Sequence, residues 1–280
     1  MFTKIYDRWL NLNARKRHSI SAAASVFAFL SALVGIAGVS LDSMYSSTPW
    51  YVRLLAICIL FILVTVAIYY MLGKLFKDNI KLQVRGIPIT IKSGDIFTQK
   101  GLKIIPFNEH YDTLLDGKTI TRNTLNGIFL EKYAGDIQAL NQVIERDAQE
   151  HSIPRNSDGK FCFELGHIIL YEDYLLLAFS KFGEQHRAHL SMPEYESCLF
   201  HMWTEVRRVY GNQPISLPLI GGGITSFDGV SQKEPQDLLR CILCTLRTSS
   251  THINQAITIL LNEENFEKID MYEMRDKMAL

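Results

Sequence analysis

The amino-acid sequence predicts an α/β domain that follows two N-terminal transmembrane helices. Two long runs near the N-terminus, Ser19–Leu41 and Leu54–Gly73, contain no charged residue. Beyond them, short apolar segments rich in Ile, Val, Leu and Phe alternate with longer amphipathic ones. This alternation is typical of a sheet whose two faces are both covered by helices. We therefore expect a three-layer α/β/α domain with a mixed sheet over residues 86–280.

The two uncharged runs are each long enough to cross a membrane. They contain 23 and 20 residues, and a helix rises ~1.5 Å per residue against a hydrocarbon core of ~30 Å. The first run also exceeds the apolar stretch of a cleaved signal peptide, which is about 7 to 15 residues long. We expect a transmembrane hairpin over residues 19–73.

Basic residues flank the two runs asymmetrically. Five Lys or Arg residues precede the first run, one lies in the connecting segment 42–53, and five follow between residues 74 and 92. Because Lys and Arg are enriched in cytoplasmic loops, both chain ends are expected in the cytoplasm. We expect residues 1–18 to form a cytoplasmic N-terminal segment and residues 74–85 to form a linker.

Neither run contains an acidic or basic residue, so an ion-transport site within the membrane is not expected. Two helices also cannot enclose a pore. If the membrane part conducts anything, several copies of the chain must assemble, so we expect a homo-oligomer in the lipid bilayer.

The remaining sequence divides into expected strands and helices by its apolar period. The expected strands are Ile87–Ile91, Leu102–Phe107, Phe161–Leu170, Tyr174–Phe179, Ile215–Ile220 and Ala256–Leu261. The expected helices are Thr124–Tyr133, Asp136–Glu150, Pro193–Tyr210 and Pro235–Thr248.

The charge balance and the cysteine and histidine spacings argue against nucleic acid and metal ions as ligands. The chain has 29 basic and 29 acidic residues, so no net field attracts it to nucleic acid. Cys241 and Cys244 form a lone CxxC pair, whereas a structural zinc site needs about four ligands. His186 and His189 lack a further ligand at a suitable spacing. We expect no metal site.

Two segments depart from ordinary core patterning directly after expected strands. The first is Ser93–Phe97, with the sequence Ser-Gly-Asp-Ile-Phe, and the second is Pro218–Thr225, which contains three consecutive glycines. Glycine allows the backbone to turn its N–H groups toward an anion such as a diphosphate. Taken alone, a triple glycine is more often an ordinary loop.

The combination of these segments with a strand that ends in Asn108 resembles the macro domain, a module that binds ADP-ribose. The resemblance implies that Asp95 hydrogen-bonds the adenine amino group and that Ile96 packs near the ring. It implies that the diphosphate is held by Gly221, Gly222, Gly223, Ile224 and Thr225. Around the distal ribose and the group attached to it, it implies Asn108, Asp112, Thr113, Leu125, Asn126 and Gly127.

A closer resemblance covers the whole chain. Two membrane helices followed by Ser93–Phe97, Phe107–Thr113 and Pro218–Gly223 are similar to the membrane-anchored macro effectors of bacterial Thoeris anti-phage defence. The resemblance implies a partner TIR-domain enzyme that makes a signal from NAD, namely an ADP-ribose derivative such as histidine joined to ADP-ribose. It implies an effector in the bacterial inner membrane that disrupts the cell, and no cofactor beyond this signalling nucleotide.

The segment Asn108–Gly117 favours a sensor over an enzyme. Macro domains that hydrolyse ADP-ribosyl groups usually carry Asn-Ala-Ala-Asn and then a glycine-rich catalytic loop, whereas this segment contains one glycine. Glu109, His110 and Asp112 could supply acid–base chemistry or could be ordinary surface. We expect no catalytic residue. The alternatives are a membrane-tethered ADP-ribosyl hydrolase and an anchor for ADP-ribosylated proteins.

Overall fold

The computed structural model describes residues 14–36, 49–75, 79–115, 117, 120–182, 188–229, 234–270 and 274. The chain divides into two compact units, Met1–Asp78 with Asp270–Glu273, and Asn79–Ile269 with Met274–Leu280. We describe each unit by itself.

In its described part, the first unit contains the helices α2 (Ala14–Ile36) and α4 (Trp50–Leu75). They pack together, with the Phe27 and Phe61 rings edge to face at 5.3 Å. Among the described residues, one helical stretch, Trp50–Met71, is long and apolar enough to span a membrane. The first expected span is helical as far as Ile36, its remaining residues lie outside the described part, and its crossing of the membrane stays a prediction.

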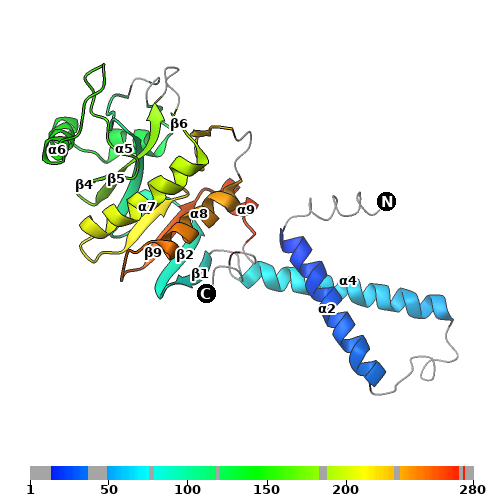
Figure 1. The fold of residues 1–280 in the computed structure, drawn as a ribbon. Helices are drawn as coiled ribbons and strands as arrows, with labels where there is room; N and C mark the ends of the chain where they lie inside the picture. Colours follow the sequence, from blue (N-terminus) through cyan, green and yellow to red (C-terminus); the bar gives the residue numbers. More distant parts are fainter. Residues whose placement is uncertain are drawn as a thin grey trace. The chain divides into compact units, whose positions relative to one another are not determined.

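The second unit is built on a mixed sheet (Figure 1). The strands found among the described residues are β1 (Asn79–Val84), β2 (Ile87–Ser93), β3 (Leu102–Asn108), β4 (Ile168–Tyr171), β5 (Tyr174–Phe182), β6 (Ala188–Leu190), β7 (Ile215–Pro218), β8 (Ser226–Phe227) and β9 (Ile257–Leu261). Their order is β1-β2-β9-β7-β3-β5-β6-β8, and β4 pairs with β5. Neighbouring strands from β2 through β9, β7 and β3 to β5 are parallel, so their carboxyl ends share one edge of the sheet.

Helices cover both faces of this sheet. On one face, α5 (Leu125–Lys132) and α6 (Ile137–Glu150) bury their apolar side chains against β3 and β5. On the other face lie α7 (Met192–Val209) and α8 (Pro235–Thr248), which run side by side in Figure 1. Two short helices, η1 (Ile96–Thr98) and α9 (Glu263–Lys268), follow β2 and β9. The expected α/β/α arrangement with a mixed sheet is confirmed.

The faces of α7 and α8 that meet the sheet explain why these helices form where the pattern predicts. Tyr195, Leu199 and Val206 recur at helical spacing on α7 and are all fully buried. Ser191 begins α7 with a capping box, in which its side chain and that of Glu194 each bond the other residue's backbone N–H. The predicted helices agree with the observed ones to within one residue at each end.

The segment expected as a linker contains a strand. In β1, Ile80, Leu82 and Val84 are buried and alternate with exposed polar residues, so the compact unit begins at Asn79 rather than at residue 86. The strand was not predicted, because only three apolar positions alternate in this segment and basic residues lie among them. The expected strand Phe161–Leu170 is also shorter than predicted, because a turn with a left-handed Gly166 precedes β4.

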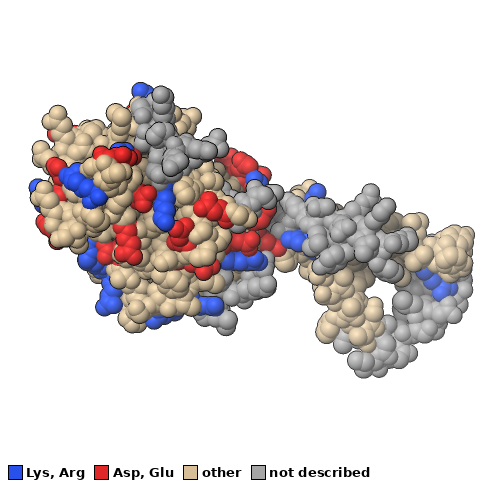
Figure 2. Space-filling view, turned by 45° about the horizontal axis from the view of Figure 1, so that its top comes forward, with Lys and Arg blue, Asp and Glu red and all other residues tan. Residues whose placement is uncertain are grey.

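The surface of the second unit agrees with the balanced composition. On the face shown in Figure 2, acidic and basic side chains are interspersed over the unit rather than separated by sign. The described part of this face therefore has no extended field of one sign that would attract a polyanion.

Candidate functional site

A cavity of about 810 Å³ lies at the carboxyl edge of the parallel strands. Its wall is formed by the ends of β3, β5, β7 and β9 and by the residues that follow β2. Its volume falls in the range of about 300 to 1,000 Å³ that is usual for small-molecule sites. This edge is also where ligands bind in open α/β sheets.

Most of the residues predicted to contact a ligand meet in this cavity. The predicted residues that line it are Asp95, Ile96, Asn108, Leu125, Asn126, Gly221, Gly222, Gly223, Ile224 and Thr225. Segments more than 100 residues apart in the sequence, such as Ser93–Phe97 and Pro218–Thr225, therefore line one cavity, and their contact with a ligand stays a prediction.

Three predicted residues lie elsewhere. Asp112 and Thr113 line a separate, smaller pocket with Lys160. Gly127 lies in the first turn of α5, where a Cβ atom would stand 2.2 Å from the carbonyl oxygen of Thr121. Glycine is needed at position 127 because the neighbouring backbone leaves no space for a side chain. Gly127 is not among the described residues that line the cavity.

The three consecutive glycines have different environments. Gly221 has a left-handed backbone with φ of +82°, and a Cβ there would lie 3.0 Å from the Phe227 ring. The N–H of Gly222 donates to the carbonyl of Leu219 at 2.9 Å and closes the turn. Gly223 has no atom within 4 Å of a hypothetical Cβ. The first two glycines are therefore needed by the turn itself, whereas Gly223 faces open space.

Asp95 begins η1 as its N-cap. Its Oδ1 accepts a hydrogen bond from the N–H of Phe97 at 3.0 Å, which is the usual role of an aspartate at this position. Among the described residues, Oδ2 accepts no further hydrogen bond, and Asp95 is the one charged residue lining the cavity. The next residue, Ile96, is buried with 2% of its surface exposed.

Asn108 ends β3 and organises the loop after it. Its Oδ1 accepts hydrogen bonds from the N–H groups of His110 and Asp112 at 3.2 and 3.1 Å. Its Nδ2 donates to the Asp112 carboxylate at 2.9 Å. The other oxygen of that carboxylate pairs with Lys160 at 2.7 Å. Asp112 is thus held toward Lys160.

Tyr111 anchors the middle of the same loop. Its backbone is left-handed, with φ of +50°, and its buried hydroxyl donates to the carbonyl of His167 at 2.8 Å and accepts from the N–H of Ala178 at 3.1 Å. Burial raises the pKa of Tyr111 well above 10, and the hydrogen bond from Ala178 offsets only part of this. The phenol therefore stays neutral and acts as a structural link.

The side chains considered for acid–base chemistry do not line the cavity. His110 contacts the carbonyl of Phe161 through Nδ1 at 2.7 Å and lines the smaller pocket. Of the two histidines considered as metal ligands, His189 pairs with Asp228 at 3.2 Å, and His186 lies outside the described residues.

Sequence reasoning missed several polar residues at the cavity wall, namely Thr121, Asn123, Ser180, Ser226, Asn262 and Asn265. Asn262 comes directly after β9, and Asn265 lies in α9. The rule that selected Ser93–Phe97, a polar residue directly after a buried strand, would also have selected Asn262.

The lining limits the chemistry that the cavity supports. Among its described residues there is no His, Cys, Lys or Arg, and Asp95 has no second carboxylate beside it. Paired general acid and base groups are therefore missing from this wall. The wall instead offers amide, hydroxyl and backbone hydrogen-bonding groups above an apolar floor, which suits recognition of a polar ligand.

Comparison with known proteins identifies the family. The model of the family described as Thoeris protein ThsA, macro domain, matches residues 89–262. This chain belongs to the ThsA macro-domain family. The matched range includes every cavity-lining residue except Asn265. The predicted relationship to Thoeris macro-domain proteins is confirmed, while anchoring by two helices stays a prediction.

A relative within the ThsA family is the Thoeris protein ThsA of Bacillus amyloliquefaciens (strain Y2). It is 35% identical over 213 residues, which cover 72% of this chain and 71% of the relative. Solved structures that resemble the chain include an Oceanobacillus iheyensis macrodomain with ADP, at 15% identity and a TM-score of 0.46, covering 71% of this chain and 95% of that one. A variant of that macrodomain with ADPR is 13% identical, with a TM-score of 0.46 and coverage of 71% and 97%.

Proposed function

We propose that this ThsA-family chain is a membrane-anchored effector of anti-phage defence that senses an ADP-ribose-derived nucleotide with its macro domain. The observation that carries the proposal is the 810 Å³ cavity at the carboxyl edge of the sheet, which combines Asp95 with the glycine-rich turn Gly221–Thr225. A partner TIR-domain enzyme supplies the signal, with histidine joined to ADP-ribose as the expected form.

In this proposal the adenine end of the ligand lies against Asp95 and Ile96. The Oδ2 atom of Asp95 accepts a hydrogen bond from the adenine amino group, since Oδ1 is already used by the η1 cap. Ile96 supplies apolar surface next to the ring. A carboxylate that is fixed by a cap needs little reorganisation on binding, which favours affinity.

The diphosphate lies between the glycine-rich turn and the N-terminus of α5. Thr124, Leu125 and Asn126 of that helix start line the cavity, and a helix N-terminus carries partial positive charge. Because no Lys or Arg lines the described wall, backbone N–H groups carry the recognition of the diphosphate.

The chain binds its signal without turning it over. A hydrolase needs a positioned acid or base, and Asp95 is the one ionisable group on the described wall. Ligand binding shifts the protein toward a state in which the membrane helices associate differently, which requires that this state bind the ligand better. The output is loss of membrane integrity by a homo-oligomer in the bacterial cell membrane, with the N-terminus and macro domain in the cytoplasm.

Calorimetric titration of the detergent-solubilised full chain with ADP-ribose, and with its histidine conjugate, tests the proposal. Gly223→Glu places a carboxylate in the cavity at a position where a side chain meets no atom within 4 Å. Gly223→Gln is its uncharged control. We expect Glu to weaken binding about tenfold or more relative to Gln, since a like charge near a phosphate costs on the order of 1–4 kcal/mol.

A second pair of variants tests the adenine contact. Asp95→Asn is expected to lower affinity about tenfold through loss of a charge-assisted hydrogen bond. Asp173→Asn, at the exposed turn between β4 and β5, is the control and should bind as the native chain does. The ligand should be recovered intact. Its consumption would favour a tethered hydrolase, and failure of both nucleotides to bind would refute the ligand assignment.

A further inference from the structure

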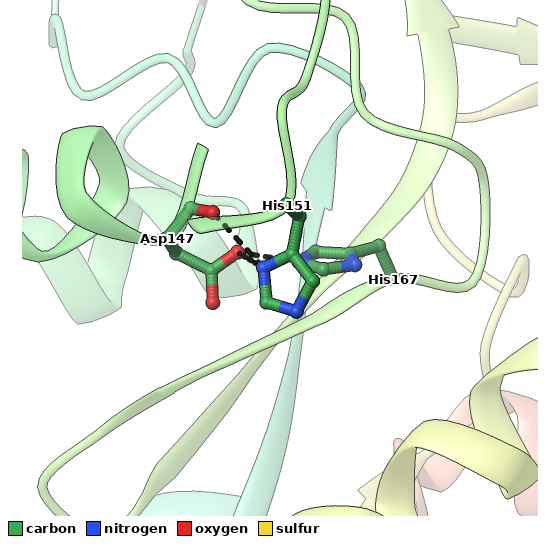
Figure 3. Close-up of side chains that lie close together, drawn as sticks. All are labelled: Asp147, His151 and His167. Atoms are coloured by element: carbon green, nitrogen blue, oxygen red, sulfur yellow. Dashed lines mark hydrogen bonds and ion pairs between the residues drawn. The ribbon is translucent and has the colours of Figure 1, made fainter. Parts of the chain in front are cut away.

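A cluster of two histidines and one aspartate lies apart from the cavity. Asp147, His151 and His167 each bring one ligand atom to within 4.8 Å of the others, as searched over the described residues. Figure 3 shows the three side chains pointing toward one another. Asp147 belongs to the last turn of α6, His151 is the residue that caps its C-terminus, and His167 directly precedes β4.

We propose that this cluster binds one divalent transition-metal ion of the zinc class. Two imidazole nitrogens and one carboxylate oxygen are a donor set that such ions prefer, with water in the remaining position. Asp147 and His151 are four residues apart at the end of a helix, so they share one face. His167 approaches from a different element.

The two distances to Asp147 are close to those of a tetrahedral site, and the two histidine ligand atoms lie within 4.8 Å of each other. Nε2 of His167 lies 2.7 Å from Oδ1 of Asp147, and Nδ1 of His151 lies 3.3 Å from the same oxygen. Ligand atoms bound at about 2.0–2.2 Å in a tetrahedron are separated by roughly 3.3 Å. Binding therefore requires the His167–Asp147 contact to open by about 0.6 Å, with the ring proton of His167 on Nδ1 so that Nε2 offers its lone pair. His151 must also give up the contact of its Nδ1 with the backbone carbonyl of Asp147 at 2.9 Å.

A second carboxylate lies on the side of the His167 ring that faces away from Asp147. Metal-binding histidines usually have such a group near the ring nitrogen that does not bind the metal. Nδ1 of His167 lies 3.7 Å from the Glu205 carboxylate, and Arg208 holds that carboxylate at 2.8 Å. With Glu205 on the Nδ1 side of the ring, Nε2 of His167 faces Asp147.

The cluster is buried at His167 and Glu205 and open to solvent at His151. His167 and Glu205 keep 8% and 13% of their side-chain surface exposed, whereas His151 keeps 39%. The ion and its water would enter beside His151. The two buried groups would be preorganised before the ion arrives, which is what a selective metal site requires.

A metal here would close the base of the segment 152–166. Phe163 of this segment donates its N–H to the carbonyl of Glu109 at 2.9 Å, and Lys160 pairs with Asp112 at 2.7 Å. The segment therefore supports the loop after Asn108. Because the ion would bind the folded chain in preference to the unfolded one, it is expected to stabilise this side of the cavity wall.

Equilibrium dialysis of the full chain in detergent against Zn²⁺, followed by elemental analysis, tests the proposal. His151→Ala removes an exposed ligand, and His252→Ala removes an exposed histidine between α8 and β9, outside the cluster, as a matched control. We expect about one zinc ion per chain for the native protein and the control, and about tenfold or greater loss of affinity for His151→Ala.

Two further readouts complete the test. At a zinc concentration about 100 times the Kd, the native Tm should rise by about 5 to 10 °C, and that of His151→Ala should not. Co²⁺ should give the visible absorption of a four-coordinate site only where His151 is present. Equal zinc content and equal Tm shifts in the His151→Ala and His252→Ala proteins would overturn the proposal.

Discussion

The Nδ2 atom of Asn108 donates to the Asp112 carboxylate at 2.9 Å, while the N–H of Asp112 donates back to Oδ1 of Asn108 at 3.1 Å. This reciprocal pair closes the loop that follows β3. It leaves Asn108 at the cavity wall and turns Asp112 toward Lys160. Asn108 and Asp112, which were predicted to contact the same end of the ligand, therefore have different surroundings.

We expect the Asn108–Asp112 pair to stabilise the fold as a unit. Asn108→Ala should lower the free energy of unfolding by about 1–3 kcal/mol, because two partly buried N–H groups, of His110 and Asp112, lose their acceptor. Asp112→Ala should cost less, and the double variant should cost less than the sum of the two. Urea unfolding of the full chain in detergent measures this. Strictly additive losses would show that the pair does not act together, and Thr113→Ala, on a more exposed hydrogen bond, serves as the control.

The thermal stability of the chain should respond differently to an added methyl group at Gly127 and at Gly223. In Gly127→Ala the new Cβ would lie 2.2 Å from the Thr121 carbonyl, whereas in Gly223→Ala it would meet nothing within 4 Å. Overpacking of this kind costs about 1–3 kcal/mol or more. Thermal unfolding should therefore show a lower Tm for Gly127→Ala and a Tm near the native one for Gly223→Ala. A native-like Gly127→Ala protein would contradict the close approach of Thr121 to α5.

Stability at acid pH should depend on Glu194. The hydrogen bond from Lys181, together with those from the N–H and hydroxyl of Ser191, lowers the pKa of Glu194 from 4.5 to about 2. A lowered folded-state pKa contributes stability above the unfolded pKa, and that contribution is lost as the pH falls from about 4.5 toward about 2.

The variant Glu194→Gln isolates this contribution. Because the carboxylate is about one-third exposed, we expect the native chain to exceed it in unfolding free energy by only about 1 kcal/mol near pH 6. The difference should shrink steadily below pH ~4.5. Denaturant titrations across this range provide the measurement, with Glu196→Gln, an exposed residue of the same helix, as the control. A difference that does not change with pH would mean that the carboxylate's charge is not involved.

The helix α4 should determine membrane attachment. It has 26 residues, equivalent to about 39 Å of helix, and Leu60 lies near its centre. Arginine at such a position costs about 2.5–3.5 kcal/mol of insertion free energy. We expect Leu60→Arg to reduce the fraction of chain that resists alkaline extraction from membranes. Leu114→Arg, at a 66% exposed position of the second unit, should leave this fraction unchanged. Equal extraction of both variants would argue against α4 as a span.

Much of the fold could be predicted because its signals are local. The apolar period of α8 gives the observed bounds Pro235–Thr248, and the parallel strands appear as buried runs bounded by turns. The strands β1, β6 and β8 were missed because their patterns are short or interrupted by charges. Of these, β1 and β6 pair with the strands next to them in the sequence, β2 and β5, whereas β8 pairs with β6, which lies far from it in the sequence.

For the candidate site, the sequence by itself determined which segments carry glycine and aspartate directly after strands, and the parallel order of the sheet then brings Asp95 and Gly221–Thr225 to one cavity. Only the tertiary structure decided where side chains point. It directs Asp112 to Lys160, and it joins Asp147, His151, His167 and Glu205 from three elements. The physical reason is that strand and helix periods arise from neighbouring residues, whereas these contacts depend on loop closure and packing between segments far apart in the chain.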